Sequence, residues 1–191
     1  MKIRHICFSV IFVLIVYVIS FAGKCAYSQL PVFGTPTERK LMIFLSNTAT
    51  PGSFGGANGA DNICNLDPAK PNGSFYRALI MDGTRNSTEH PSWALRPNTK
   101  YWHTDGVNVI GSTEISSAKL QIPLTYPITS ANESVWTGIT AGWTLSASCI
   151  NWSTTSGNSY VGKSNEVSMA LLYNAVLLCS MSARLYCVEQ P

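Results

Sequence analysis

The sequence has few charged residues, few histidines and few of the short motifs that mark an enzyme or a metalloprotein. Charged residues make up 12% of the 191 residues, and only three residues are histidine. No H-E-x-x-H pair occurs, and no two cysteines have the C-x-x-C spacing of a zinc ribbon. The glycine-rich segment at 51–59 lacks G-x-G-x-x-G, and no Gly-Lys-Ser/Thr directly follows it, which favours a turn over a phosphate-binding loop. The chain also shows no internal repeat, heptad run or low-complexity block, which argues against a repeat protein.

The first 28 residues have the pattern of a secretory signal peptide. A basic start with Lys2 and Arg4 precedes an apolar run at 6–22, and the small residues Ala26 and Ser28 stand where a signal peptidase cuts. The apolar run is at the lower limit for crossing a bilayer, so an uncleaved membrane anchor is the alternative. We expect cleavage after Ser28 and export to the outside of the cell, the cell surface or the periplasm, with no stable membrane span afterwards.

The net positive charge of the chain comes from this leader. Lys2, Arg4 and Lys24 are three of the 13 basic residues, and the leader contains no acidic residue. The remaining chain is therefore formally neutral and has no basic stripe, so nucleic acid is not an expected partner. Residues 29–39 are expected to form a linker, and residues 40–191 are expected to form a single domain.

Four cysteines lie beyond the leader, and three of them are near the C-terminus. If the fold brings the two ends of the domain together, Cys64 can pair with Cys187, and Cys149 can pair with Cys179 inside that loop. In the loop-entropy model the inner and outer bonds would contribute roughly 3.5 and 5 kcal/mol to the free energy of unfolding. Disulfides and a surface of Ser, Thr, Asn and Gly suit an oxidising, extracellular environment.

The local patterns predict an α+β domain of strands and loops with little helix. One helix is expected at 59–67, where apolar residues recur at spacings of three and four, with Asn58 as its cap. A short helical turn is expected at 93–95, and Asp105-Gly106 is expected to turn a hairpin. Strands are expected at 40–46, 75–81, 100–103, 107–110, 134–137, 148–152, 175–179 and 184–189.

Two pairs of apolar residues near the C-terminus stand at period two. These pairs are Val176 with Leu178, and Leu185 with Cys187. The alternation predicts that each pair lies on the buried face of a half-buried antiparallel sheet.

Short segments of the chain occur in a recognisable order: 55–64, 73–79, 91–93, 105–106, 134–138, 149–152, Cys179 and Cys187. In this order they resemble blocks of endostatin, the C-terminal domain of certain collagens. The chain is more similar still to a family of exported bacterial domains of unknown function, which share the Gly-Ala-Asp-x-x-Cys element at 59–64, the stretch at 95–99 and the Leu-Tyr-Cys-Val ending at 185–188. The resemblance implies a C-type-lectin-like, endostatin-like fold with mostly antiparallel strands, long loops, one or two short helices and paired N- and C-terminal strands. It also implies the nested disulfides Cys64–Cys187 and Cys149–Cys179.

The metal sites of these relatives have no counterpart in the sequence. Calcium-dependent lectins use a Glu-Pro-Asn or Gln-Pro-Asp loop and a Trp-Asn-Asp strand, whereas the residues before Cys179 read Asn-Ala-Val-Leu-Leu. The zinc of endostatin depends on a His-rich N-terminus, and only His90 and His103 follow the leader. We expect no metal and no cofactor.

The tryptophans divide into core residues and candidates for ligand binding. Trp93, Trp136 and Trp152 are expected in the core because an indole buries a large apolar area. Trp102 and Trp143 are expected to be more accessible. The candidate ligand-binding residues are Trp102, His103, Asp105 and Trp143.

From these patterns we expect a secreted, calcium-independent recognition or adhesion domain without catalytic residues. Its expected partner is an extracellular protein or a glycan. One alternative is a secreted enzyme, such as a hydrolase, with a loop site around His103, Asp105 and Trp143. Another alternative is a structural component of an envelope assembly.

Overall fold

The computed structural model of the protein describes residues 39–191. The predicted signal peptide at 1–28, and all but the last residue of the predicted linker at 29–39, lie outside the described residues. Within the described range, no helix combines the length and the apolar character needed to cross a bilayer.

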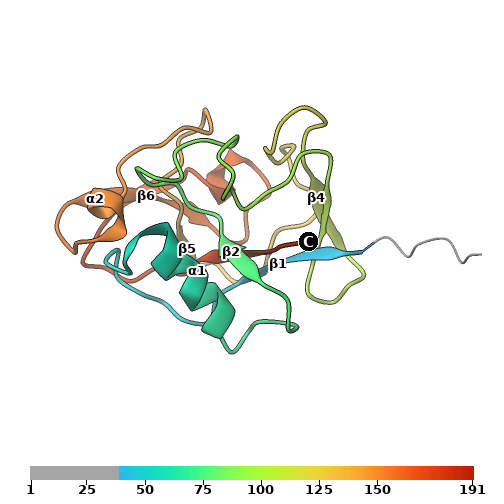
Figure 1. Ribbon diagram of the computed structural model, residues 1–191, viewed down its shortest axis with the longest axis horizontal. Coiled ribbons are helices and arrows are strands. Elements are labelled where there is room, and N and C mark those ends of the chain that lie inside the picture. The colour runs from blue at the N-terminus through green and yellow to red at the C-terminus, as the bar shows by residue number, and fades with distance from the viewer. Residues whose placement is uncertain (1–38) are drawn as a thin grey trace, which may run out of the picture. The chain divides into compact units, whose positions relative to one another are not determined.

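The described part is a mixed α+β fold of short strands, long loops and a few helical segments (Figure 1). This agrees with the α+β class predicted from the local patterns. The elements are β1 (Leu41–Leu45), α1 (Gly56–Leu66), β2 (Tyr76–Ala78), β3 (Lys100–Trp102), β4 (Val109–Ser112), β5 (Ser134–Trp136), α2 (Cys149–Trp152), β6 (Asn158–Lys163), the 3-10 turn η1 (Met169–Leu171), β7 (Ala175–Leu178) and β8 (Tyr186–Glu189).

The strands form two sheets, and the first and last strands are neighbours in the larger one. The five-stranded sheet has the order β2-β8-β1-β3-β4, and the smaller sheet has the order β5-β6-β7. β1 and β8 are antiparallel, with Phe44 opposite Cys187. The predicted pairing of the N- and C-terminal strands is therefore present. One pair, β1 with β3, is parallel, which the sequence patterns did not indicate.

The central strands β1 and β8 are buried on both faces. Ile43 and Val188 belong to one core cluster, whereas their neighbours Phe44 and Cys187 belong to a second one. Because side chains alternate along a strand, the sheet separates the two clusters. The face that carries Phe44 and Cys187 packs with α1, and the long loops complete the other cluster.

Helix α1 begins three residues before its predicted start, and the predicted cap residue Asn58 is inside it. Its N-cap is Gly55, whose φ of 87° is in the left-handed region, and no side chain at that position caps the helix. The carboxylate of Asp82 replaces such a cap, because its Oδ2 accepts a hydrogen bond from the Ala57 amide at 2.8 Å. A distant residue that caps a helix leaves no local signal, so the prediction of Asn58 was wrong.

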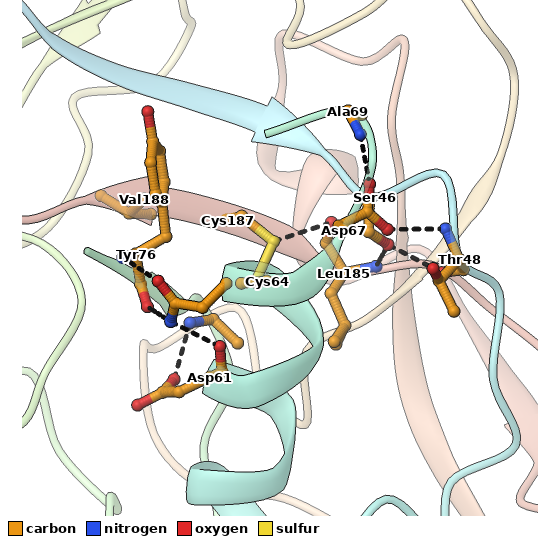
Figure 2. Close-up of a disulfide and its surroundings, with 12 residues drawn as sticks. Ser46, Thr48, Asp61, Cys64, Asp67, Ala69, Tyr76, Leu185, Cys187 and Val188 are labelled. Carbon is orange, nitrogen blue, oxygen red and sulfur yellow. Dashed lines mark hydrogen bonds between the residues drawn. A yellow bond between two sulfur atoms is a disulfide. The ribbon is translucent and has the colours of Figure 1, made fainter. Parts of the chain in front are cut away.

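Two nested disulfides connect the elements, as the cysteine spacing and the resemblance predicted. Cys64 of α1 is bonded to Cys187 of β8, and Cys149 is bonded to Cys179 just after β7. Figure 2 shows the first bond at the C-terminal end of α1. The outer bond attaches the helix to the terminal strand pair, and the inner bond attaches α2 to the smaller sheet.

Three local predictions were wrong. The predicted strand at 148–152 is the helical turn α2, and the residues at 93–95 are not helical. Strand β6 was not predicted at all, because its polar residues show no clear apolar alternation. These three segments are held by contacts with distant parts of the chain, which local patterns do not report.

Candidate functional site

The smaller sheet leaves one face and one edge outside the core. β7 is one of its two edge strands and pairs only with β6 within the described residues. On the inner face, Ser159 and Val161 of β6 are buried and Leu177 of β7 packs against the second core cluster. On the outer face, Val176 and Leu178 are 54% and 60% exposed. The period-two prediction therefore identified the strand correctly but assigned the wrong face to this pair.

Two tyrosines extend the exposed face. Tyr160 lies opposite Val176 in the β6–β7 register, and its ring centroid is 4.5 Å from that of Tyr173. The Tyr173 hydroxyl is 3.4 Å from the Tyr160 hydroxyl, and this hydrogen bond raises the pKa of Tyr173. We call Tyr160, Tyr173, Val176 and Leu178 together the β7 surface.

More exposed apolar side chains stand on segments attached to β7. Met181 lies in the turn after β7. Its amide donates a hydrogen bond to the Leu178 carbonyl, and its side chain is 52% exposed. Ile150 is 71% exposed and lies next to Cys149, which is bonded to the end of β7 through Cys179. Five of the ten large hydrophobic residues exposed in the described part are thus on β7 or on segments attached to it. Such a concentration is typical of an interaction surface.

The chain around β7 also lacks charge. No Asp, Glu, Lys or Arg occurs from 167 to 183, a segment that includes all of β7 and its two flanking turns. The exposed face is therefore apolar and hydroxyl-bearing, and it has no charged side chain of its own to keep it hydrated.

The segment that presents Ile150 has an unusual backbone. Cys149, Ile150, Asn151 and Trp152 have φ values of 49°, 52°, 54° and 59°, so four consecutive non-glycine residues lie in the left-handed region. Each residue of this kind costs about 1–2 kcal/mol. Strain of this kind persists only where the surroundings over-determine it, and it is enriched at functional sites.

Three contacts hold this strained turn. Trp152 is buried, donates from Nε1 to the Met81 carbonyl at 2.8 Å, and stacks on Phe54. Asn151 accepts a hydrogen bond from the Gly83 amide through Oδ1 at 2.7 Å. The disulfide of Cys149 fixes the other end. The turn is therefore rigidly held, and Ile150 projects from it.

Three of the four predicted ligand-binding residues lie on the β3–β4 hairpin, and their contacts are structural. Lys40 Nζ lies 4.3 Å from the centre of the Trp102 ring. Asp105 Oδ1 accepts the amides of Asn108 and Val107, which lowers the pKa of Asp105 and closes the turn. Asp105 Oδ2 is 3.9 Å from His103 Nδ1. The carboxylate thus has a local role in shaping the hairpin.

The fourth predicted residue, Trp143, lies elsewhere and is buried. It is only 7% exposed, belongs to the first core cluster, and has a φ of 59°. It lines a shallow cleft of about 560 Å³ with Glu114 and Lys119, and the hairpin residues do not line that cleft. The expectation of an accessible Trp143 was wrong, whereas Trp93, Trp136 and Trp152 are buried as predicted.

The residues with catalytic potential are held in structural contacts. Ser159 is buried in β6, and its hydroxyl donates to the Ala147 carbonyl. Ser92 Oγ is 2.9 Å from His90 Nδ1, but the Ser92 amide also donates to that nitrogen, so the contact closes a three-residue loop. Among the described residues, no three His, Cys, Asp or Glu side chains gather where they could hold a metal ion.

The sequence-based predictions missed one motif, which lies in β6. Residues 157–164 read Gly-Asn-Ser-Tyr-Val-Gly-Lys-Ser, which fits the P-loop spacing G-x-x-x-x-G-K-S. In the structure, 158–163 of this stretch form β6, which pairs with β5 on one side and with β7 on the other. A P-loop needs instead a loop that leads into a helix. The match is therefore a coincidence of spacing.

Comparison with known proteins gives a family and no activity. No curated protein matches the chain. The model of one family, described as "Protein of unknown function (DUF1554)", matches residues 47–170, which is well over half of the chain. The matched segment includes α1, Cys64, Cys149 and the strained turn, and ends just before β7. The chain therefore belongs to the DUF1554 family.

Proposed function

We propose that the protein is a secreted, disulfide-bonded recognition or adhesion domain that binds an extracellular protein through the β7 surface, without calcium. The observation that carries this proposal is the exposure of Val176 and Leu178 on an uncharged sheet face, with further exposed apolar side chains, Met181 and Ile150, on segments attached to β7. Protein interfaces are depleted of charge at their centres and enriched in aromatic and apolar side chains.

The cysteines and the leader pattern support an extracellular location. Two disulfides suit an oxidising environment, and the N-terminal pattern is that of an export signal. The finer fold assignment, a C-type-lectin-like fold similar to endostatin, belongs to the same proposal. The paired terminal strands and the nested disulfides support it.

A protein partner is favoured over a glycan by the surroundings of the tryptophans. Sugars stack on open indole faces, but Lys40 lies over the Trp102 ring and Trp143 is almost fully buried. The enzyme alternative is weakened by Asp105, whose oxygens accept hydrogen bonds within the hairpin and whose Oδ2 is 3.9 Å from His103 Nδ1, beyond hydrogen-bond distance.

The test is a binding screen of the exported protein against immobilised extracellular-matrix proteins and a glycan array, with and without EDTA. We expect binding to at least one protein, unchanged by EDTA and reduced at least about tenfold by Leu178→Lys, since a buried charge is costly at an apolar contact. Leu66→Lys is the matched control, because Leu66 is 85% exposed on α1. Binding confined to glycans, or lost in EDTA, would contradict the proposal.

A further inference from the structure

We propose that the β7 surface takes its protein partner as an added strand: an extended, uncharged segment pairs with the free edge of β7. This inference rests on the proposed function and names the mode of binding and the chemistry of the partner segment. It is carried by the backbone at the edge of the sheet, in addition to the exposed side chains.

The register of β6 and β7 determines which backbone groups are free. In an antiparallel pair, hydrogen-bonded and non-hydrogen-bonded residue pairs alternate. The Cys179 amide donates to the Gly157 carbonyl, so the next bonded pair is Leu177 with Ser159. Val176 and Leu178 belong to the non-hydrogen-bonded pairs that alternate with these bonded pairs, so their backbone N–H and C=O groups point away from β6. The Leu178 carbonyl accepts the Met181 amide, which leaves Val176 N–H, Val176 C=O and Leu178 N–H directed to the free edge.

The free edge of β7 carries none of the side-chain or bulge protection of natural edge strands, although the strand is short. Natural proteins blunt an edge strand with lysine, proline, a bulge or an inward charge, because unpaired backbone groups invite another strand. β7 reads Ala-Val-Leu-Leu, its register with β6 is regular over four pairs, and no charged residue occurs from 167 to 183. An open and unprotected edge beside exposed apolar side chains is the arrangement used for strand addition.

The side chains specify what the partner segment contains. Val176 and Leu178 stand on the outer face, and Leu177 points to the core, so an added strand would place every second side chain beside the exposed pair. A charged side chain there would lose water without finding a counter-charge, since the segment around β7 has none. The partner segment is therefore extended, uncharged and apolar at alternate positions.

A second copy of this chain is a poorer occupant. β7 has four residues, which at a rise of about 3.4 Å per residue span about 14 Å. Two copies joined along that length would bury far less than the roughly 800 Å² per partner of a stable interface. A peptide segment needs less area, because main-chain hydrogen bonds along the edge supply much of its affinity.

The experiment selects 12-residue peptides without charged residues from a display library on the exported protein, and measures their affinity by fluorescence polarisation. Val176→Pro removes an amide that β6 does not use, and proline is tolerated on an edge strand in that position. We expect Val176→Pro and Leu178→Lys each to weaken binding at least about tenfold, and Leu66→Lys to leave it unchanged. N-methylation of alternate amides in the peptide should abolish binding in one register and spare it in the other, which tests the backbone pairing even if Val176→Pro does not fold.

The outcomes separate this inference from the proposed function. No selected peptide, or peptides that bind wild type and Val176→Pro equally, would overturn strand addition. If a matrix protein still bound the wild type, and Leu178→Lys still weakened that binding, the proposed function would stand without strand addition. A wild-type dimer in sedimentation velocity that Val176→Pro dissolves would show that the edge is occupied by a second copy, and would overturn the choice of partner.

Discussion

The carboxylate of Asp61 on α1 and the guanidinium of Arg85 form an ion pair inside the domain, with Oδ2 and Nη2 2.7 Å apart. Only 1% of the Arg85 side chain and 10% of the Asp61 side chain are exposed. Asp61 Oδ1 also accepts the Ala78 amide of β2, and Arg85 Nη1 donates to the Ala78 carbonyl. The pair thus holds the helix, β2 and the loop after it together. It also explains the acidic residue in the Gly-Ala-Asp-x-x-Cys element, whose cysteine is bonded to β8.

Removing the Asp61 charge should destabilise the domain strongly. In Asp61→Asn the Arg85 guanidinium stays buried without a counter-charge, and we expect a loss of about 3–5 kcal/mol in the free energy of unfolding. Glu133→Gln is the control, because Glu133 faces Arg184 at the surface and its loss should cost under about 1 kcal/mol. Urea unfolding of both variants checks this. Equal, small losses would mean that the buried pair is not a structural link.

The two disulfides should contribute unequally. In the loop-entropy model, the bond that spans 123 residues contributes roughly 5 kcal/mol, and the bond that spans 30 residues contributes roughly 3.6 kcal/mol. Replacing Cys64 and Cys187 by serine should therefore lower the unfolding midpoint more than replacing Cys149 and Cys179. Non-reducing peptide mapping of the wild type gives the pairing itself. A Cys64–Cys149 linkage would contradict the structure.

Acid should destabilise the domain through two carboxylates that serve as backbone acceptors. Burial raises the pKa of Asp67, but the amides of Asn47, Thr48 and Ala69 outweigh it and hold that pKa below its ordinary value of 3.8 (Figure 2). Burial likewise opposes ionisation of Asp82, and hydrogen bonds from Arg85, Thr84 and Ala57 lower its pKa.

A folded-state pKa that is lowered stabilises the protein above the unfolded-state value, and this stabilisation is lost as the pH falls through the folded-state value. The unfolding midpoint should therefore be flat above about pH 5 and should fall steeply below about pH 4. Asp67→Asn should lower the midpoint at pH 7 and make the acid decline shallower. If the midpoint of Asp67→Asn fell as steeply with acid as that of wild type, Asp67 would not contribute to the acid destabilisation.

Gly162 should not tolerate a side chain. A Cβ at this position in β6 would overlap the carbonyl of Leu171, the last residue of η1. Gly162→Ala should cost about 3 kcal/mol or more, because backbone must move to relieve the overlap. Gly73→Ala is the matched control, because a Cβ there meets nothing within 4 Å. Thermal melts compare the two, and a Gly162→Ala midpoint equal to that of Gly73→Ala would refute the packing described.

Stability should not depend on a metal ion. Thermal melts in EDTA, calcium and zinc should coincide, since a bound ion would stabilise the folded state by RT ln(1 + [L]/Kd). Reduction of the disulfides should lower the midpoint in all three buffers. A rise of several degrees in saturating calcium would reveal a site and would restore calcium-dependent sugar binding as a function.

The sequence predicted well the elements that have a local apolar pattern and the elements that a disulfide connects. β1 and β8 have compact apolar runs, and the cysteine spacing correctly linked α1 to β8. The turn at 149–152 was beyond prediction, because Cys, Ile and Trp rarely adopt the left-handed region and Asn adopts it only as a single residue. Distant contacts from Met81 and Gly83 hold the turn in this conformation.

The candidate site was predicted less well for a related reason. Tryptophans in loops indicate possible ligand contacts, but whether an indole is open depends on the whole fold, and Trp143 is covered. Val176 and Leu178 were noticed as a period-two pair, and the prediction placed them inside. The alternation shows that two residues share a face of the strand, but it does not show which face meets the core. Here the face that carries Leu177 meets the core.

The antiparallel pairing of β1 with β8 has a consequence for how the domain can be attached to other molecules. Ile43 lies opposite Val188, so the chain enters the domain beside the point where it leaves. Figure 1 shows the start of β1 at one end of the domain and α2, with Ile150, at the opposite end. A carrier protein could therefore accept residues 39–191 as an insertion in a single surface loop, with both junctions on one side. The strained turn would then project away from the carrier, which makes this domain suitable for display on particles or sensors.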